Sequence, residues 1–155
     1  MHLGVPDPDG FTFGIHFGSI GLGLGLGIGA AVARPDRTSV VVVGDGGLMM
    51  SLAELDTISR YQLPVVVAVM NDAAYGAELF ALKAHKRSPG LAYFDRPEFA
   101  RLMDGFGGRG ATVCTVDDLL ALEPELRKPS GPMLLDIKLR RGVVTDWYRR
   151  LMPGP

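Results

Sequence analysis

Residues 44–76 have the sequence GDGGLMMSLAELDTISRYQLPVVVAVMNDAAYG, and this stretch decides the predicted fold. Two acidic turns, at Asp45 and at Asn71-Asp72, each follow directly after a valine-rich run. One amphipathic helix is expected between them, which gives a strand, a turn, a helix, a second strand and a second turn. In a parallel sheet both turns open at the carboxyl end of the strands, where open α/β sheets bind ligands.

The charge around these turns favours a metal ion over a bare phosphate. Arg60 is the only basic residue between positions 38 and 82, whereas five residues there are acidic: Asp45, Glu54, Asp56, Asp72 and Glu78. A divalent cation held by the two turn acids would reverse the local sign, and the N–H groups of Gly46 and Gly47 could hold further oxygens. Mg²⁺ suits hard oxygen ligands of this kind. Either turn alone is also explained as a tight turn or a helix cap, but the pair favours a metal site.

Composition indicates a single globular domain over residues 1–155, because 155 residues at 47% hydrophobic and 21% charged can bury one core. A net charge of −1 predicts no attraction to nucleic acid or to anionic membranes. The only cysteine, Cys114, cannot form an internal disulfide and fits a reducing cytosol. The uncharged run 10–33 is too rich in glycine for a good membrane span, and no basic residue precedes it as in a signal peptide.

Glycine alternates with Leu or Ile through residues 19–33. The period of two suggests a strand, but five glycines would leave one face of that strand bare. As a helix, the segment would carry a smooth ridge of Gly21, Gly25 and Gly29, at a cost of about 1 kcal/mol per glycine relative to alanine. Such a ridge makes sense where something approaches the backbone closely. The Rossmann fingerprint G-x-G-x-x-G is absent, so a dinucleotide site is unsupported.

Further strands and helices alternate along the chain. Residues 39–43 are expected to form a central strand buried on both faces, and residues 51–54 (SLAE) have the form of a helix capping box. The fold class predicted is α/β, a doubly wound three-layer α/β/α arrangement around a mostly parallel sheet. The other expected elements are helices at 52–63, 78–85, 96–105 and 117–122, with Phe99 and Leu102 on one side of the third, and strands at 65–70, 111–116 and 132–139.

The two turns resemble the C-terminal, diphosphate-binding (PP) domain of thiamine-diphosphate enzymes in the acetolactate synthase and 2-oxoacid decarboxylase family. That family has GDG, then about 27 positions from its Asp to an Asn, a carbonyl ligand two residues on, and Tyr-Gly. Here the count from Asp45 reaches Asp72, and Ala74 supplies the carbonyl before Tyr75-Gly76. The sequence departs from the pattern in having Asp where Asn is usual. The resemblance therefore implies Mg²⁺ on Asp45, Asp72 and the Ala74 carbonyl, with Asn71 as the alternative to Asp72.

The resemblance extends to the glycine-rich segment. The stretch Gly18-Ser19-Ile20 is similar to the part of the family that faces the cofactor's two rings, where the position of Ile20 bends the cofactor and that of Gly18 offers a carbonyl. Taken alone, Ile20 could equally be a core residue. The cofactor-binding residues implied in this way are Gly18, Ser19, Ile20, Gly44, Asp45, Gly46, Gly47, Asp72, Ala74, Tyr75, Gly76 and Ala77.

Two residues are candidates for catalysis. Glu78 stands where some decarboxylases of the family place a catalytic glutamate, although an acid in the first turn of a helix is also a favourable helix-start residue. His16 lies three residues before Ser19 and could reach a substrate, or could be a hydrogen-bonded structural histidine. Trp147 and Tyr148 could pack on the domain or cover the site.

The family's activity implies carbon–carbon bond cleavage or ligation of a 2-oxoacid through the C2 carbanion of thiamine diphosphate. It also implies a pyrimidine-binding domain or subunit that supplies an activating glutamate, and nothing in these residues corresponds to that domain. We therefore expect one component of a homo- or hetero-oligomeric cytoplasmic enzyme, inactive alone, arising from a split enzyme or a truncated chain. The alternatives are a non-catalytic cofactor-binding or regulatory module, and an unrelated Mg²⁺-dependent phosphate enzyme on a flavodoxin-like sheet.

Overall fold

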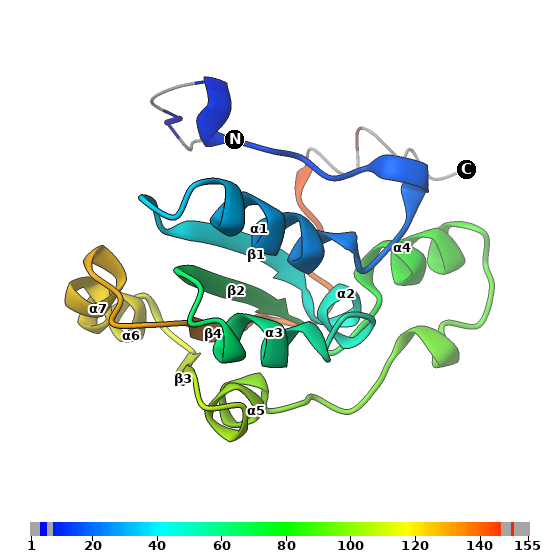
Figure 1. The fold of residues 1–155 in the computed structure, drawn as a ribbon. Helices are drawn as coiled ribbons and strands as arrows, with labels where there is room; N and C mark the ends of the chain where they lie inside the picture. The colour runs from blue at the N-terminus through cyan, green and yellow to red at the C-terminus, as the bar shows by residue number, and fades with distance from the viewer. Residues whose placement is uncertain (1–3, 6–7, 147–149, 151–155) are drawn as a thin grey trace.

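The computed structural model describes residues 4–5, 8–146 and 150, and centres on a four-stranded parallel sheet (Figure 1). The order of the strands across the sheet is β1-β2-β4-β3, and every neighbouring pair is parallel. The strands are β1 (Ser39–Gly44), β2 (Val65–Asn71), β3 (Arg109–Val113) and β4 (Met133–Lys138). Trp147 and Tyr148 lie outside the described residues.

Helices connect the strands as the alternating pattern predicts. The first crossover, from β1 to β2, passes through two short helices, and the connection from β2 to the far edge at β3 passes through two more. The α-helices are α1 (Leu22–Ala33), α2 (Asp45–Met49), α3 (Glu54–Arg60), α4 (Gly76–Ala84), α5 (Phe99–Gly105), α6 (Val116–Ala121) and α7 (Glu123–Arg127), and the 3₁₀ turns are η1 (Pro8–Gly10), η2 (His16–Gly18) and η3 (Gly90–Ala92).

The core has two sides because successive strand residues point to opposite faces of the sheet. Val65, Val67 and Val69 of β2 face a large cluster that also contains buried residues of α1, α2, α3 and α5. Val66 and Leu135 face the other way and pack with partly buried leucines of the α6–α7 region. Helices therefore cover both faces, which confirms the predicted doubly wound α/β/α fold (Figure 1).

The glycine-rich segment forms the helix α1, but its close contacts lie on a different face from the one expected. A Cβ atom at Gly27 would come within 2.0 Å of a Val41 methyl group, and one at Gly23 within 2.8 Å of Val43. Gly25 and Gly29 face open space. The expected ridge is therefore correct only at Gly21, where a Cβ atom would lie 2.9 Å from the Met50 Cβ atom. It is wrong at Gly25 and Gly29, because the helix rests on β1 through Gly23 and Gly27.

Strand β1 is not central, contrary to expectation. It lies at the edge of the sheet, and the side chains of Val40 and Val42 are 65% and 66% exposed. The valine run correctly predicted a strand, but the helices on the second face cover only the β3–β4 side.

Two local details of the helices also differ. The Ser51 hydroxyl donates to the Gly47 carbonyl at 3.4 Å, and α3 begins at Glu54 without a side-chain cap, so the predicted capping box is wrong. A capping box forms instead between Thr115 and Asp118 at the start of α6. In α5 the buried partner of Phe99 is Met103, one position after the expected Leu102.

Candidate functional site: two acidic turns at one edge of the sheet

The turns after β1 and β2 lie side by side at the carboxyl edge of the sheet. The two strands are parallel and in register up to the pair Gly44 and Met70, so both chains leave the sheet at the same level. Gly44 is the N-cap of α2, which begins directly with Asp45. The predicted meeting of the two turns is therefore present in the fold.

The Asp45 carboxylate joins the turns physically. It is 1% exposed, and its two oxygens accept different backbone N–H groups: Gly46 donates to Oδ1 at 2.9 Å and Ala73 donates to Oδ2 at 2.6 Å. Since Ala73 belongs to the second turn, this side chain ties the end of β1 to the end of β2.

Asp72 lies beside Asp45 and is partly buried. Its Oδ2 atom lies 3.5 Å from where a Cβ atom on Gly76 would stand, so the carboxylate reaches back over the first residue of α4. The Ala74 N–H stabilises the charged form of both carboxyls. The two acids therefore converge on the backbone at Ala74.

Burial makes both carboxyls harder to ionise. Desolvation is the largest cause that raises the pKa of Asp45 above 3.8; the N–H groups of Gly46 and Ala73 oppose it, and the charge of Asp72 adds to it. Desolvation likewise raises the pKa of Asp72, opposed by the Ala74 N–H and by the charges of Arg141 and Arg96. Asp45 forms no ion pair with any lysine or arginine of the described residues. A cation from outside would relieve this unfavourable charge.

The second turn is held in a strained conformation. Ala73 has a φ of 59°, which is unfavourable for a residue with a Cβ atom. Its fixed position directs its N–H to Asp45 and allows its carbonyl to accept from the Phe94 N–H at 3.3 Å. The Tyr75 ring packs edge-on against Phe94 and covers Gly46, where a Cβ atom would come within 2.5 Å of the ring. Gly46 is therefore required for the two turns to pack together.

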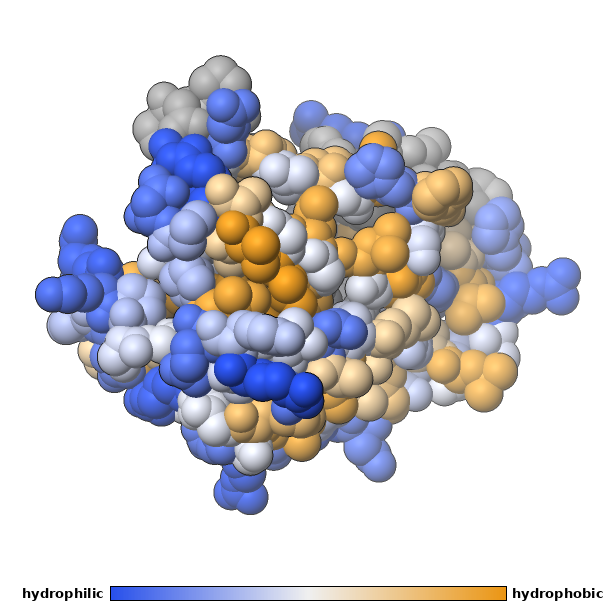
Figure 2. All heavy atoms as spheres, in the orientation of Figure 1, coloured by the Kyte–Doolittle hydropathy of each residue, from blue (hydrophilic) through white to orange (hydrophobic). Residues whose placement is uncertain are grey.

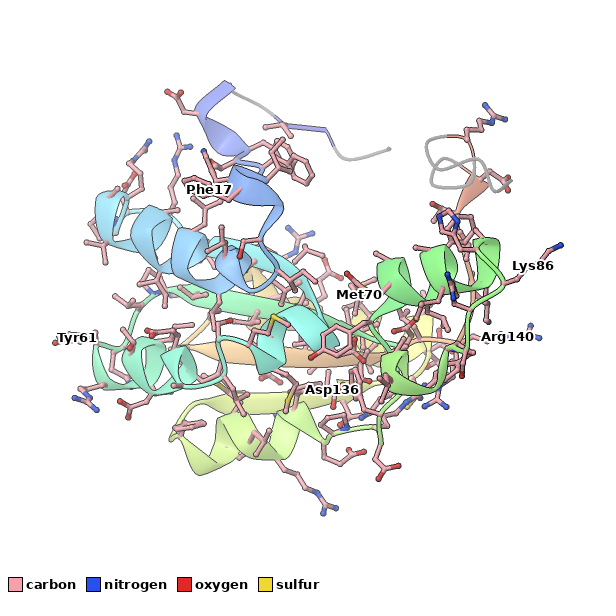
Figure 3. The ribbon with its side chains drawn as sticks, turned by 90° about the vertical axis from the view of Figure 1, so that its right-hand side faces the viewer. Phe17, Tyr61, Met70, Lys86, Asp136 and Arg140 are labelled. Carbon is pink, nitrogen blue, oxygen red and sulfur yellow. The ribbon has the colours of Figure 1, made fainter. Side chains whose placement is uncertain are left out.

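Asn71 faces away from this pair of acids. Its amide nitrogen donates to Asp136 Oδ1 at 2.8 Å and to the Pro97 carbonyl at 3.1 Å, inside the protein. Figure 3 shows Asp136 in the interior between the sheet and α5. This orientation favours Asp72 over Asn71 as the residue available to a ligand.

The N-terminal segment 18–21 lies against the first turn. Ile20 comes to 3.7 Å from the place of a Cβ atom on Gly47, and the Gly21 nitrogen to 3.9 Å. Ile20 is 42% exposed, so it is not a core residue. Gly18, with a φ of 60°, and Ser19 precede it and are exposed. The structure thus brings the segment 18–21 to the Asp45 turn.

The two candidate catalytic residues are exposed. Glu78 lies in the first turn of α4, and His16 lies in η2 before the Gly18 turn. Ala77, together with Asp72 and Gly76, lines a cavity of about 300 Å³ between α4 and residues 142–145. This cavity opens beside the second acidic turn and is bordered by Phe80 and Lys83.

Sequence reasoning missed the supports behind the second turn. Arg141 donates to the Asp72 carbonyl at 3.3 Å, and Lys138 donates to the buried Asp136 at 2.8 Å. A signal for the latter pair was present, because Asp136 and Lys138 are charged residues two positions apart within an otherwise apolar strand.

Among the described residues, no group of three or more His, Cys, Asp or Glu side chains forms a metal-ligand cluster.

Comparison with known proteins identifies the family. Residues 1–137 match the family described as thiamine pyrophosphate enzyme, C-terminal TPP binding domain. The chain belongs to this family. The match excludes the alternative of an unrelated phosphate enzyme on a flavodoxin-like sheet, and the chain is a TPP-binding C-terminal domain like that of acetolactate synthase.

Two curated relatives illustrate the range of the family. The chain is 37% identical over 134 residues to a 2-hydroxyacyl-CoA lyase of Oryza sativa subsp. japonica, which covers 78% of this chain and 22% of that protein. It is 31% identical over 141 residues to the acetolactate synthase isozyme 2 large subunit of Escherichia coli (strain K12), which covers 90% of this chain and 26% of that protein. The chain thus spans about a quarter of the length of these TPP enzymes.

A solved structure agrees with the fold. The Rhodococcus jostii RHA1 thiamine diphosphate-dependent 4-hydroxybenzoylformate decarboxylase superimposes with a TM-score of 0.72 at 29% identity, over 79% of this chain and 23% of that one. No helix within the described residues is long and apolar enough to cross a membrane.

Proposed function

We propose that the chain binds thiamine diphosphate through a Mg²⁺ ion held by Asp45, Asp72 and the Ala74 carbonyl. The observation that carries this proposal is the buried Asp45 carboxylate, which receives two backbone N–H groups but has no ion-pair partner among the described residues. The neighbouring Asp72 adds a second charge. Two acids at one sheet edge, both destabilised by burial, fit a hard divalent cation, which takes carboxylate and carbonyl oxygens.

Glycine backbone and the N-terminal segment would complete the cofactor site. The N–H groups of Gly46 and Gly47 at the start of α2 suit diphosphate oxygens. We assign the other contacts with the diphosphate to the two turns. Contacts with the cofactor's rings are assigned to residues 18–20, next to the point where the chain packs on Gly47. The proposed cofactor-contacting residues are Gly18, Ser19, Ile20, Gly44, Tyr75, Gly76 and Ala77.

When bound, thiamine diphosphate supplies a carbon nucleophile at C2 that allows a bond beside the carbonyl of a 2-oxoacid to be broken or formed. The role of this chain is to bind and orient that group. We assign the activating glutamate to a pyrimidine-binding domain or subunit, corresponding to part of the relatives that the chain does not match. The chain alone is then inactive, and the active form is a cytosolic homo- or hetero-oligomer.

Glu78 and His16 are proposed to act on the substrate rather than on cofactor binding. Both are exposed, and Glu78 is in the first turn of α4, next to Ala77 on the wall of the cavity beside Asp72. In the assembled enzyme, Glu78→Gln should slow turnover without changing the affinity for thiamine diphosphate. Equal turnover would leave Glu78 with a helix-start role only.

Calorimetric titration tests the proposed function directly. Thiamine diphosphate is titrated into the chain with Mg²⁺ and, separately, with EDTA. Binding heat is expected only with Mg²⁺, because the carboxylates of Asp45 and Asp72 would repel a diphosphate that carries no metal ion. Heat that is equal in the two titrations, or absent from both, would overturn the proposal.

A further inference from the structure

The second acidic turn is paired with a segment about twenty positions further along the chain. Residues 92–94 lie antiparallel to residues 73–75, with Ala74 opposite Tyr93. Two main-chain hydrogen bonds flank this bridge, from the Tyr75 N–H to the Ala92 carbonyl at 2.9 Å and from the Phe94 N–H to the Ala73 carbonyl at 3.3 Å. The conformation of the turn therefore depends on residues 92–94.

This pairing directs the main chain of Ala74 toward the two acids. Where the flanking residues make the hydrogen bonds of an antiparallel bridge, the N–H and C=O groups of the bridged residue point away from the paired segment. The Ala74 N–H acts on the carboxyls of Asp45 and Asp72, and its carbonyl accepts no hydrogen bond from the described residues. The carbonyl is thus free on the side of the acids.

Arg141 contacts both of the paired segments. Its Nε atom donates to the Asp72 carbonyl at 3.3 Å, and its Nη2 atom donates to the Phe94 carbonyl at 3.3 Å. Its guanidinium carbon lies 5.2 Å from the centre of the Tyr93 ring, within the range of a cation–π contact. A guanidinium can make these contacts together because it is planar and its N–H donors are fixed in direction.

The other cations near this site do not contact the turn in this way. Figure 2 shows hydrophilic side chains projecting beyond the end of α4, where Lys83, Lys86 and Arg87 are exposed. Lys83 also lies over the Tyr93 ring, at 5.9 Å from its centre. Arg140 points outward (Figure 3) and makes no hydrogen bond or ion pair with the described residues. The contacts therefore distinguish Arg141 from an ordinary surface cation.

We propose that Arg141 is a positioning residue that holds residues 92–94 on the second turn, and so fixes Asp72 and the Ala74 carbonyl for the metal ion. Only the benefit to the ion rests on the proposed function; the holding of the turn does not. The positive charge of Arg141 acts on Asp72 and by itself disfavours a cation there. The benefit to the site therefore comes from the hydrogen bonds of Arg141 and not from its charge.

The same substitution at two neighbouring positions tests whether Arg141 holds the turn. Arg141→Lys keeps the charge but replaces the planar group by a single donor atom, and Arg140→Lys is the matched control. Amide hydrogen exchange is measured without Mg²⁺ or thiamine diphosphate. Exchange at Tyr75 and Phe94 should become about fivefold faster in Arg141→Lys and stay unchanged in Arg140→Lys. Equal rates in Arg141→Lys and the wild type would refute the proposal.

Calorimetric titration of the same variants tests the benefit to the ion. Mg²⁺-dependent affinity for thiamine diphosphate should fall about fivefold in Arg141→Lys and stay within about twofold in Arg140→Lys. Arg141→Gln should lose less affinity than Arg141→Lys, because it also removes a charge that repels the ion. Wild-type affinity in Arg141→Lys together with tighter binding in Arg141→Gln would mean that Arg141 acts only through its charge, which contradicts the proposal.

A core amide separates a local effect from a general loss of stability. Val67 is fully buried in the middle of β2, and its exchange should be the same in Arg141→Lys as in the wild type. Faster exchange at Val67 by the same factor as at Phe94 would show general loosening and count against a positioning role. If the wild type gave no Mg²⁺-dependent heat, the proposed function would fail, and the exchange rates would still decide whether Arg141 holds the turn.

Discussion

Asp45, directly after strand β1, and Asp136, within strand β4, are both buried carboxylates, and they differ in which groups compensate their charge. Asp136, fully buried in β4, accepts from Lys138 Nζ at 2.8 Å, from the Asn71 amide at 2.8 Å and from the Phe99 N–H at 2.9 Å. Asp45, at the start of α2, accepts only backbone N–H groups, and it forms no ion pair within the described residues.

The comparison separates a structural acid from one suited to binding. Asp136 has its cation built into the same strand, so its charge is compensated in the folded chain. It also fixes the start of α5 through Phe99 and the end of β2 through Asn71. Burial and the charge of Asp72 both disfavour the ionised form of Asp45, and a bound cation would favour it. The two carboxylates are equally buried, but Asp136 stabilises the fold and Asp45 is suited to binding a cation.

The largest expected effect is on the structural acid. Asp136→Ala leaves Lys138, which is only 10% exposed, without its buried partner and should cost about 3–5 kcal/mol of unfolding free energy. Urea denaturation measures this loss. Glu98→Gln is the matched control, because Glu98 is the exposed partner of the same lysine and should change stability by less than about 1 kcal/mol. If the two variants lost equally little, the interior network would not stabilise the fold.

Asp45→Asn should show the reverse behaviour. Stability should change by no more than about 1 kcal/mol, because the lost hydrogen bond to one N–H is offset by removal of a buried charge. Mg²⁺-dependent binding of thiamine diphosphate should weaken roughly 100-fold or more, since a charged metal ligand is gone.

Asp136→Asn is the control for that titration and should leave the affinity within about threefold, because it keeps the shape of a side chain whose partners are Asn71, Phe99 and Lys138. Equal weakening by Asp45→Asn and Asp136→Asn would mean that the distinction between the two acids is wrong.

The difference between these acids also explains what the sequence could predict. The valine runs before each turn predicted β1 and β2, and the parallel crossover predicted that Asp45 and the second turn would meet. These are local patterns joined by a general topological rule. The ligand roles given to Asp45, Asp72 and Ala74 remain predictions.

Features that depend on non-local packing were missed. Alternating glycines in α1 present several helical faces, and only contact with β1 selects Gly23 and Gly27. The edge position of β1 depends on which elements flank it, which its own valines do not specify. Asn71 and Asp72 are adjacent in sequence, and the partner that turns Asn71 inward, Asp136, lies 65 positions away.

The acid pair should also give the chain free of Mg²⁺ an unusual pH dependence. The pKa values of Asp45 and Asp72 are raised by folding, so their stabilising contribution is fully present below 3.8 and is lost as the pH rises through the higher folded values. Urea midpoints measured from about pH 4 to 7 should therefore fall with rising pH more steeply in the wild type than in the double variant Asp45→Asn, Asp72→Asn. Excess Mg²⁺ should reduce the slope of the wild type only. Parallel curves without Mg²⁺ would contradict the raised pKa values.

The smallest effect is expected at the second acid of the turn pair. Asp72→Asn keeps an oxygen ligand and removes repulsion from Asp45, so Mg²⁺-dependent affinity for thiamine diphosphate should stay within about threefold of the wild type.

Asn71→Ala tests the neighbouring residue as the alternative ligand. It should lower stability through Asp136 by about 1–3 kcal/mol while leaving the affinity unchanged. Loss of binding in Asp72→Asn together with a harmless Asn71→Ala would show that the site needs both negative charges. Loss of binding in Asn71→Ala at unchanged stability would instead identify Asn71 as the metal ligand. Its hydrogen bond to Asp136 would then contribute little to stability.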